Sequence, residues 1–339
     1  MTPASIGIAI IGTGRAGMIH AGNFHRSVPA TKIVALSDAV PDSLAAAARD
    51  LNCDATFADY RDALRHPGVD AIVIATPTSL HREIAEAAAG LGKHIFCEKP
   101  MAMNVAECDA MIAAAERGKV ILQIGFMRRF NESFLAAKAR IDAGDIGKVV
   151  QVKTLTHGPT YPRPWMFDLA RSNGPLAEVN SHDIDSVRWF SGSEFTEVYA
   201  IADNYRTDAA RKSHPDFYDQ VLLTARLQNG GQGLISGAQG VQYAYDARCE
   251  ILGTEGMITI GSLNANEVVV CTKDKELRRP SMVSWMNLFR EAYLAEDTEF
   301  VACIREGRPP SAGGRDGRAA VAVVNAGNQS IRERKPIAL

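Results

Sequence analysis

The chain has 339 residues, of which 46% are hydrophobic and 22% charged, and its formal net charge is −2. This length is more than one hydrophobic core usually serves, so the sequence predicts two domains. Acidic and basic residues are interspersed rather than grouped in blocks, which argues against nucleic acid or an anionic membrane as a partner.

The cysteines and the apolar runs indicate in which cellular compartment the protein is expected. None of the six cysteines approaches CxxC spacing, and most lie in apolar runs such as HIFCEKP and EVVVC. They are expected to be reduced core thiols rather than zinc ligands or a disulfide framework. The stretch MTPASIGIAIIG has no basic segment, and no apolar run reaches membrane-spanning length. The sequence therefore predicts a cytoplasmic protein.

A β-branched run at residues 6 to 11 is followed by the glycine-rich stretch GTGRAG, residues 12 to 17, and then by a helix-compatible segment. In a turn from strand to helix, Gly12 permits the tight bend, Gly14 lets the backbone approach a pyrophosphate, and Gly17 lets the helix pack on the strand. The pyrophosphate would rest on the helix N-terminus, where unpaired N–H groups favour an anion. This pattern predicts a dinucleotide site.

A second strand, at residues 32 to 37, ends at Asp38. An acidic residue about 20 positions after the glycines can bind the ribose hydroxyls of NAD and repels the 2′-phosphate of NADP. The sequence thus favours NAD over NADP. The alternative is that Asp38 only caps the helix that starts near Pro41.

Further strands are expected at residues 69 to 77, 93 to 100 and 119 to 126, separated by alanine-rich helical stretches. Strands that alternate with helices predict a parallel, doubly wound sheet whose ligands bind beyond the carboxyl ends of the strands. Lys99 follows one buried strand directly and precedes a proline, which would hold it at the mouth of that crevice. The alternative for Lys99 is an ordinary solvated surface lysine.

After a linking helix, at residues 130 to 143, the pattern changes to alternating strands with a hairpin-type Asn-Gly. The predicted fold class is therefore α/β: an N-terminal Rossmann doubly wound parallel sheet, plus a C-terminal α+β domain with a large open, mostly antiparallel sheet. We expect a dinucleotide-binding domain at residues 1 to 126 and a domain for substrate binding and oligomerisation at 127 to 339. A C-terminal helix that packs back on the first domain is compatible with this division. The open sheet predicts a homo-oligomer, either a dimer or a tetramer.

The stretch from Pro175 to Phe190 has a helical pattern in which Glu178, His182 and Asp185 share one face. Such a stripe fits a helix that lines an acid/base pocket. Two other interpretations remain open, namely a metal cluster and an interior histidine flanked by solvated acids. The loop at residues 157 to 168, which contains Trp165, is either a lid or substrate wall or a rigid surface connector.

Seven motifs follow one another along nearly the whole chain: IGTGRAG, AIVIATPTSLH, FCEKPMA, GFMRRFN, SHDID, YAYDARCEILGTEG and FVACIREGRPP. In this order they resemble the Gfo/Idh/MocA oxidoreductases, the family of glucose-fructose oxidoreductase and inositol 2-dehydrogenase. GFMRRFN and YAYDARCEILG are closer to the inositol 2-dehydrogenase branch than to the family at large.

The resemblance implies that Lys99 is the catalytic lysine and that His182 transfers the proton. Glu178 stands where family members commonly have Asp, and its longer arm moves the carboxylate outward by about one C–C bond. The substrate-binding residues expected from the resemblance and from the loop are Arg129, Asp185, Tyr243, His157 and Trp165. The cofactor-binding residues expected are Gly12, Gly14, Arg15, Ala16, Gly17, Asp38, Thr76, Pro77, His81, Glu98 and Lys99.

These groups suit the NAD-dependent oxidation of a secondary hydroxyl on an inositol, sugar or sugar acid. His182 can accept the hydroxyl proton, because histidine titrates near neutral pH. Lys99 would stabilise the developing alkoxide, and Glu178 would hold the lysine in place. A keto-sugar reductase or aldose dehydrogenase of the same family is an alternative function. A dinucleotide-binding sensor without turnover is an alternative of another class.

The sequence predicts no metal, and it assigns His20, His81 and His94 to helix or strand ends, with His81 near the cofactor.

Overall fold

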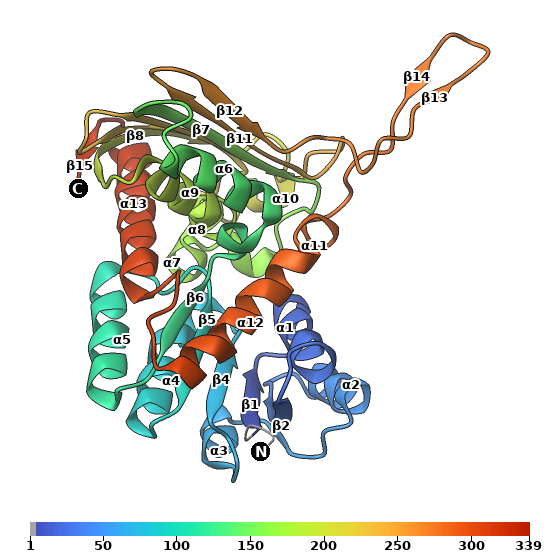
Figure 1. The fold of residues 1–339 in the computed structure, drawn as a ribbon, viewed down its shortest axis with the longest axis vertical. Coiled ribbons are helices and arrows are strands. Elements are labelled where there is room, and N and C mark those ends of the chain that lie inside the picture. The colour runs from blue at the N-terminus through green and yellow to red at the C-terminus, as the bar shows by residue number, and fades with distance from the viewer. Residues whose placement is uncertain (1–4) are drawn as a thin grey trace. The chain divides into compact units, whose positions relative to one another are not determined.

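The computed structural model describes residues 5–339, which form two compact units (Figure 1). The first unit ends at Phe130 and also includes Glu291–Val321, while the second comprises Asn131–Arg290 and Ala322–Leu339. The expectation about an N-terminal basic segment depends in part on residues 1–4, which lie outside the described residues. Among residues 5–339, no helix combines the length and apolar character needed to cross a bilayer.

The first unit is built on a six-stranded sheet with the order β3-β2-β1-β4-β5-β6, and every strand pair in it is parallel. The order reverses direction between β1 and β4, as in a doubly wound dinucleotide-binding fold, so the predicted Rossmann sheet is confirmed. Its strands are β1 (Ile6–Ile11), β2 (Thr31–Ser37), β3 (Thr56–Phe57), β4 (Ala71–Ile74), β5 (His94–Glu98) and β6 (Leu122–Gly125).

Helices cover both faces of this sheet. On one face, Ile8 and Ile10 of β1 pack with Phe24 of α1 and Phe300 of α12 in a continuous buried cluster. A second layer is formed by α4 and α5, which pack against each other. The helical segments of the unit are α1 (Arg15–Arg26), α2 (Pro41–Leu51), α3 (Tyr60–Arg65), η1 (Thr78–Leu80), α4 (His81–Gly90), α5 (Val105–Gly118), η2 (Met127–Phe130), α12 (Arg290–Glu306) and the start of α13 (Gly314–Glu333).

The second unit is built on a seven-stranded sheet with the order β12-β11-β7-β10-β9-β8-β15. Its strands are β7 (Val149–Gly158), β8 (Phe195–Asp203), β9 (Gln220–Leu227), β10 (Gln232–Gln239), β11 (Asp246–Gly253), β12 (Met257–Ile260) and β15 (Ile337–Ala338). The Asn-Gly turn joins β9 to β10 as an antiparallel hairpin, as predicted. β7 and β10 pair in parallel, so the sheet is mixed, although its other pairs are antiparallel.

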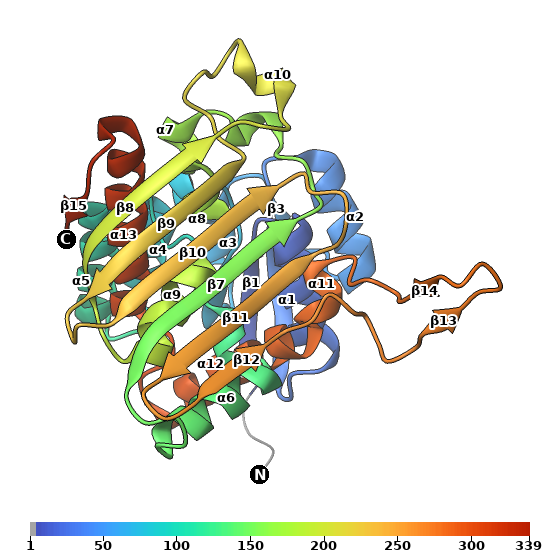
Figure 2. The ribbon, with the colours of Figure 1, turned by 90° about the horizontal axis from the view of Figure 1, so that it is seen from above.

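One face of the second sheet is covered by helices of the same unit, and Figure 2 shows the strands in front of α6, α8 and α9. These and the unit's remaining helical segments are α6 (Glu132–Asp142), η3 (Pro164–Met166), α7 (Leu169–Ser172), α8 (Gly174–Glu178), α9 (Ser181–Ser191), α10 (Asp208–Arg211) and α11 (Trp285–Leu288). The other face of the sheet carries Tyr199, Ile201 and Leu222 as exposed side chains. The predicted open sheet is therefore present.

The prediction of core thiols holds for five cysteines but is wrong for Cys271. All six are free, and Cys271 alone is exposed. It lies in the small hairpin of β13 (Val270–Cys271) and β14 (Leu277–Arg278), which extends away from the large sheet of its unit (Figure 1). The apolar run EVVVC suggested burial, but a two-stranded ribbon has no second layer to cover it.

Candidate active site

The glycine-rich turn between β1 and α1 has the geometry that its sequence predicts. Gly12 has a φ of 97°, a region that side chains other than glycine rarely adopt. A Cβ on Gly17 would lie 1.9 Å from the Gly12 carbonyl oxygen, so only glycine lets α1 pack this closely. A Cβ on Gly14 would meet no atom within 4 Å. Gly14 is the N-cap residue of α1 and leaves open space before the helix N-terminus.

This contrast between two neighbouring glycines gives a stability prediction. Gly17→Ala is expected to destabilise the protein by at least about 2 kcal/mol, because the methyl group must displace backbone. The melting temperature should fall by roughly 4–8 °C in thermal unfolding. Gly14→Ala is the matched control, with a change within about 0.5 kcal/mol, since its methyl group enters open space. Equal melting temperatures for the two variants would contradict the interpretation that Gly17, unlike Gly14, has no room for a side chain.

Asp38 lies at the carboxyl end of β2 and binds the glycine-rich turn. Its Oδ2 accepts hydrogen bonds from the backbone N–H of Thr13 at 2.7 Å and from the Thr13 hydroxyl at 2.8 Å. Its Oδ1 accepts from the Val40 N–H at 2.8 Å, whereas α2 begins at Pro41 without a side-chain cap. Asp38 therefore orders a local turn and does not cap α2. It is half-buried beside the predicted dinucleotide turn.

The end of β4 and the turn after β5 are joined by His81. The Nε2 atom of His81 lies 2.9 Å from the Thr76 carbonyl oxygen, and Nδ1 lies 2.9 Å from that of Pro100. The side chain is 1% exposed, and burial lowers the pKa of the imidazole. His81 thus fixes the Thr76-Pro77 strand end from within the protein. Its assignment to the cofactor remains a prediction.

Lys99 directly follows β5, in the position that the strand pattern predicts. It is half-buried, and its backbone N–H donates to Glu98 Oε2 at 3.0 Å. The Lys99–Pro100 peptide bond is cis. Glu98 is 7% exposed, and a Cβ on Gly125 would lie 3.2 Å from its carboxylate carbon. The lysine backbone is therefore held by a carboxylate packed between the ends of β5 and β6.

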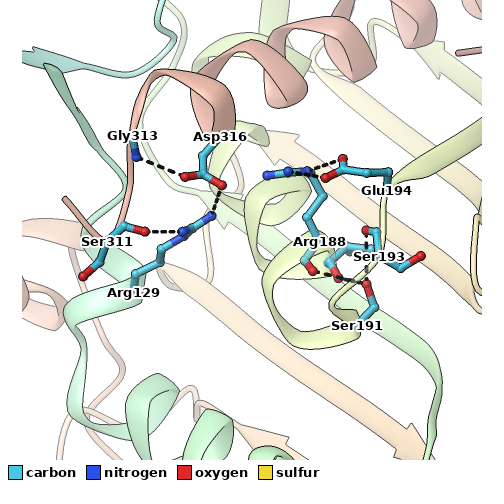
Figure 3. A network of polar contacts seen from close by, with 9 residues as sticks. Arg129, Arg188, Ser191, Ser193, Glu194, Ser311, Gly313 and Asp316 are labelled. Atoms are coloured by element: carbon cyan, nitrogen blue, oxygen red, sulfur yellow. Dashed lines mark hydrogen bonds and ion pairs between the residues drawn. The ribbon is translucent and has the colours of Figure 1, made fainter. Parts of the chain in front are cut away.

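Arg129 was expected at the substrate, and the structure places its guanidinium against its own unit (Figure 3). The guanidinium donates to the Ser311 carbonyl oxygen at 2.5 Å and to Asp316 Oδ1 at 2.9 Å. Asp316 Oδ2 in turn accepts from the Gly313 N–H at 3.0 Å. Arg129 is 7% exposed, and these contacts anchor the segment that leads into α13. Arg129 therefore stabilises this segment of the first unit, while its contact with substrate remains a prediction.

The continuous helix predicted from Pro175 to Phe190 is wrong. The segment is divided into α8, which ends at Glu178, and α9, which begins at Ser181. Asn180 lies in the break, where its side-chain amide donates to Asp183 Oδ2 at 2.8 Å. Asparagine competes for local hydrogen bonds and so favours such breaks. Glu178 and His182 are therefore on different helices, and the spacing argument holds only within α9.

Within α9, His182 and Asp185 are placed on one side by their spacing of three residues. His182 is 6% exposed and Asp185 is 1% exposed, so neither belongs to a solvated face. The alternative of solvated acids is thus wrong for Asp185.

Asp183, between these two residues, anchors α9 to the sheet. It is fully buried and accepts from the Thr154 hydroxyl at 2.6 Å and the Thr156 hydroxyl at 2.7 Å. Both threonines are on β7, and the Asn180 amide supplies a further donor. The role of Asp183 was not predicted from the sequence, although the alternation of Thr154 and Thr156 on one strand face was a usable signal.

His157 and Tyr243, both expected at the substrate, contact each other. His157 Nδ1 lies 2.8 Å from the Tyr243 hydroxyl, which donates to Asp246 Oδ2 at 3.1 Å. His157 Nε2 lies 3.0 Å from the Ser236 hydroxyl. Burial lowers the pKa of His157, while burial and the nearby Asp246 raise the pKa of Tyr243 to about 12.

The face of β7 that His157 occupies follows from strand alternation. Thr154 and Thr156 point toward α9, so His157 points to the opposite face of the sheet. His157 and Tyr243 are thus brought together with each other rather than with His182. Trp165, in η3, is 36% exposed, as expected for a loop at the surface. The substrate roles of all three residues remain predictions.

The first unit also contains a buried polar cluster that was not predicted from the sequence. His20 is on α1, Glu98 ends β5, and Glu296 and Asp297 are on α12, and all four are buried. Among residues 5–339, His20, Glu98 and Glu296 form the group whose donor atoms are close enough to share a metal ion. His20 was expected only as a helix or strand-end residue, since its partner Asp297 is 277 positions away and no local pattern connects the two.

Comparisons with known proteins agree with the Rossmann fold of the first unit. A model of the oxidoreductase family with an NAD-binding Rossmann fold matches residues 6–126. A model of the GFO/IDH/MocA C-terminal domain matches residues 134–259. Together these models match well over half of the chain.

The relatives cover nearly the full length. The chain is 34% identical to the scyllo-inositol 2-dehydrogenase (NAD(+)) of Bacillus subtilis over 98% of this chain and 95% of that one. It is 30% identical to the myo-inositol 2-dehydrogenase of Thermotoga maritima over 98% of both. The scyllo-inositol dehydrogenase of Lactobacillus casei, solved with NAD(H) and scyllo-inositol, superposes with a TM-score of 0.91 at 27% identity, over 98% of this chain and 99% of that one. The chain therefore belongs to the Gfo/Idh/MocA family of oxidoreductases, whose N-terminal domain is an NAD-binding Rossmann fold.

Proposed function

We propose that this protein oxidises a secondary hydroxyl of a cyclic polyol or sugar, with an inositol as the substrate type and NAD as the hydride acceptor. The proposal is supported by one observation above others. A lysine directly after β5 and a buried histidine on α9 occur in a chain that aligns over 98% of its length with inositol 2-dehydrogenases. The first unit would hold the cofactor, and polar residues of the second would bind substrate hydroxyls.

The residues of the first unit fit a dinucleotide. The open space at Gly14 admits a phosphate group to the N-terminus of α1, where Arg15 and Ala16 begin the helix. Asp38 presents a half-buried carboxylate at the next strand end, suited to ribose hydroxyls. Thr76-Pro77 and Glu98-Lys99 provide the following strand ends. When bound, NAD supplies an acceptor for the hydride.

In this proposal, His182 accepts the hydroxyl proton and Lys99 stabilises the oxygen from which the proton leaves. A secondary alcohol loses its hydroxyl proton as its carbon is oxidised, so a base is needed. His182 is assigned this part because imidazole exchanges protons near neutral pH. Lys99, as a cation, is assigned to hydrogen-bond the reacting oxygen and to favour alkoxide character. Asp185 is assigned to accept hydrogen bonds from neighbouring hydroxyls, and Glu178 to hold the lysine.

Asp38 gives a prediction on cofactor choice. Asp38→Ser is expected to raise the ratio of kcat/KM with NADP to kcat/KM with NAD by about tenfold or more, because repulsion of the 2′-phosphate is removed. Initial rates with each cofactor measure this ratio. Asp42→Asn, an exposed acid in the first turn of α2, is the matched control and should leave the ratio unchanged. An unchanged ratio in Asp38→Ser would remove Asp38 from cofactor selection.

The test of the proposed function is absorbance at 340 nm with purified protein, NAD or NADP, and a panel of inositols, aldoses and sugar acids. Turnover with NAD on a stereochemical subset of cyclic polyols is the expected result. Turnover only in the reverse direction, on a keto-sugar with NADH, would replace the proposal with a reductase. NADH binding without turnover in either direction would replace it with a sensor.

We also propose that the open face of the seven-stranded sheet associates with a second copy of this chain. Ile201 and Leu222 lie directly opposite each other on β8 and β9, with 54% and 38% of their surfaces exposed. The same face carries the ion pairs of Arg226 with Glu197 and of Lys153 with Glu250. A face that mixes apolar side chains with both signs of charge can complement a second copy of itself across a two-fold axis.

The association is tested by light scattering after size-exclusion chromatography. The unaltered chain is expected to have at least twice the mass of one chain, and Ile201→Glu to shift the mass toward one chain, since burying an unpaired carboxylate is costly. Leu277→Glu, at an exposed residue of the β13–β14 hairpin, is the control that should leave the mass unchanged. A monomer in the unaltered chain would contradict the proposal.

A further inference from the structure

Behind Lys99, a continuous line of hydrogen bonds runs through the buried core of the first unit. Asp297 Oδ1 on α12 lies 2.7 Å from His20 Nδ1, and His20 Nε2 lies 3.0 Å from Glu98 Oε1. The other Glu98 oxygen, Oε2, accepts the backbone N–H of Lys99 at 3.0 Å. Two helices and a strand end are thereby connected to one amide of the lysine.

The His20 side chain is fixed by its neighbours in this chain of hydrogen bonds. It is completely buried, and its ring packs against Phe96 at 4.6 Å and Tyr293 at 5.5 Å between ring centroids. Asp297, also completely buried, is oriented by the Asn23 side-chain amide, which donates to Oδ2 at 2.8 Å. The imidazole therefore has one well-defined position from which to fix Glu98.

The charges of the cluster are consistent with a protonated histidine. Ionised carboxylates can only accept hydrogen bonds, so with Asp297 and Glu98 both ionised each ring nitrogen of His20 donates to one of them. Burial lowers the pKa of His20, but Asp297 and Glu98 outweigh it and raise that pKa well above the ordinary histidine value. Burial raises the pKa of the neighbouring Glu296 well above the usual carboxyl range, and it also raises the pKa of Asp297.

We propose that His20 is a positioning residue for Lys99, which fixes the Glu98 carboxylate so that Glu98 holds the lysine backbone at the end of β5. The inference rests on the proposed role of Lys99 in alkoxide stabilisation. Residues that orient a catalytic group typically contribute 10- to 100-fold, and a displacement of about 1 Å has a similar effect on rate. Without His20, Glu98 would lose its hydrogen-bonded partner in the core and would no longer be fixed toward the Lys99 amide.

The experiment has one readout that needs no turnover and one that does. Hydrogen exchange of the Lys99 amide, compared between the unaltered protein and His20→Ala, reports the bond to Glu98 directly. The exchange rate is expected to rise by about 10- to 100-fold in the variant, because the acceptor is no longer fixed. For the polyol found in the panel, kcat is expected to fall by a similar factor while NADH affinity stays within about threefold.

Two further variants separate positioning from folding. His94→Ala alters the opposite end of β5, where His94 Nδ1 accepts the Ile121 N–H, and should leave both the Lys99 exchange rate and kcat near their original values. Glu98→Gln keeps the shape of the side chain and an acceptor for Lys99, so it should retain more of kcat than His20→Ala. If His20→Ala does not fold, Asp297→Asn tests the same chain of hydrogen bonds. It should raise the Lys99 exchange rate and lower kcat by smaller factors.

Several results would overturn the inference. An unchanged Lys99 exchange rate in His20→Ala would show that the line does not hold the lysine. Faster exchange with an unchanged kcat would show that the line does not serve the reaction. One metal ion per chain, lost in His20→Ala, would replace the hydrogen bonds with a coordination site at His20, Glu98 and Glu296. If the unaltered protein turned over no substrate, the proposed function would fail, and the exchange measurement would still decide whether His20 holds Lys99.

Discussion

His182→Ala and Lys99→Met are each expected to lower kcat by about 10²–10⁴-fold while NADH binding persists. The loss of a positioned acid or base has this size, and so does the loss of a charge aimed at a developing oxyanion. The glycine-rich turn and Asp38 remain intact in both variants, so most of the predicted cofactor contacts are kept. Steady-state rates at 340 nm and fluorescence titration with NADH measure the two quantities separately.

Matched substitutions control for the general effect of losing a histidine or a lysine. His25→Ala removes an exposed histidine of α1, and Lys273→Met removes an exposed lysine of the β13–β14 hairpin. Both controls should keep kcat within about twofold, as surface changes usually do. Near-normal turnover in His182→Ala would remove His182 from the proton transfer. The same result in Lys99→Met would remove the lysine from alkoxide stabilisation.

Asp183→Ala is expected to destabilise the protein by about 3–5 kcal/mol. The substitution leaves the hydroxyls of Thr154 and Thr156 and the Asn180 amide in the core without their shared acceptor, and each buried unsatisfied group costs about 1–3 kcal/mol. The effect should appear as a fall of roughly 6–20 °C in the melting temperature.

Asp208→Ala provides the comparison for Asp183, because Asp208 is exposed and its ion pair with Arg211 is at the surface. Exposed ion pairs contribute about 0–1 kcal/mol, so this melting temperature should change little. Asp183→Asn should lie between the two, since the amide oxygen keeps one acceptor. A melting temperature for Asp183→Ala equal to that of Asp208→Ala would contradict the role of Asp183 as the anchor of α9.

Local sequence signals predicted most of the first unit. The run before Gly12, the glycine spacing and the alternation of apolar strands with alanine-rich helices are all encoded within short windows, and the structure confirms them. The Asn-Gly hairpin between β9 and β10 is of the same kind. The short β3 and α3 carried too few apolar residues for a periodic pattern and were not predicted.

The failures arose where distant contacts decide the structure. The helix break at Asn180 depends on Asp183 and on the close approach of Gly237, where a Cβ would lie 2.0 Å from Asn180 Oδ1. The His20 cluster depends on α12, far along the chain. EVVVC was expected in a core because periodicity cannot tell a buried strand from an uncovered ribbon. The contact of Arg129 with Asp316 could not be inferred from local sequence either, and the substrate role of Arg129 stays a prediction.

In the proposed reaction, a hydride leaves a ring carbon of a cyclic polyol for NAD. We would follow this transfer with fully ring-deuterated scyllo- and myo-inositol, purified protein and NAD, and analyse the NADH formed by mass spectrometry. The NADH is expected to carry one deuterium, and His182→Ala is expected to form far less of it. NADH without deuterium, or no NADH formed by a protein that binds NADH, would rule out this hydride transfer.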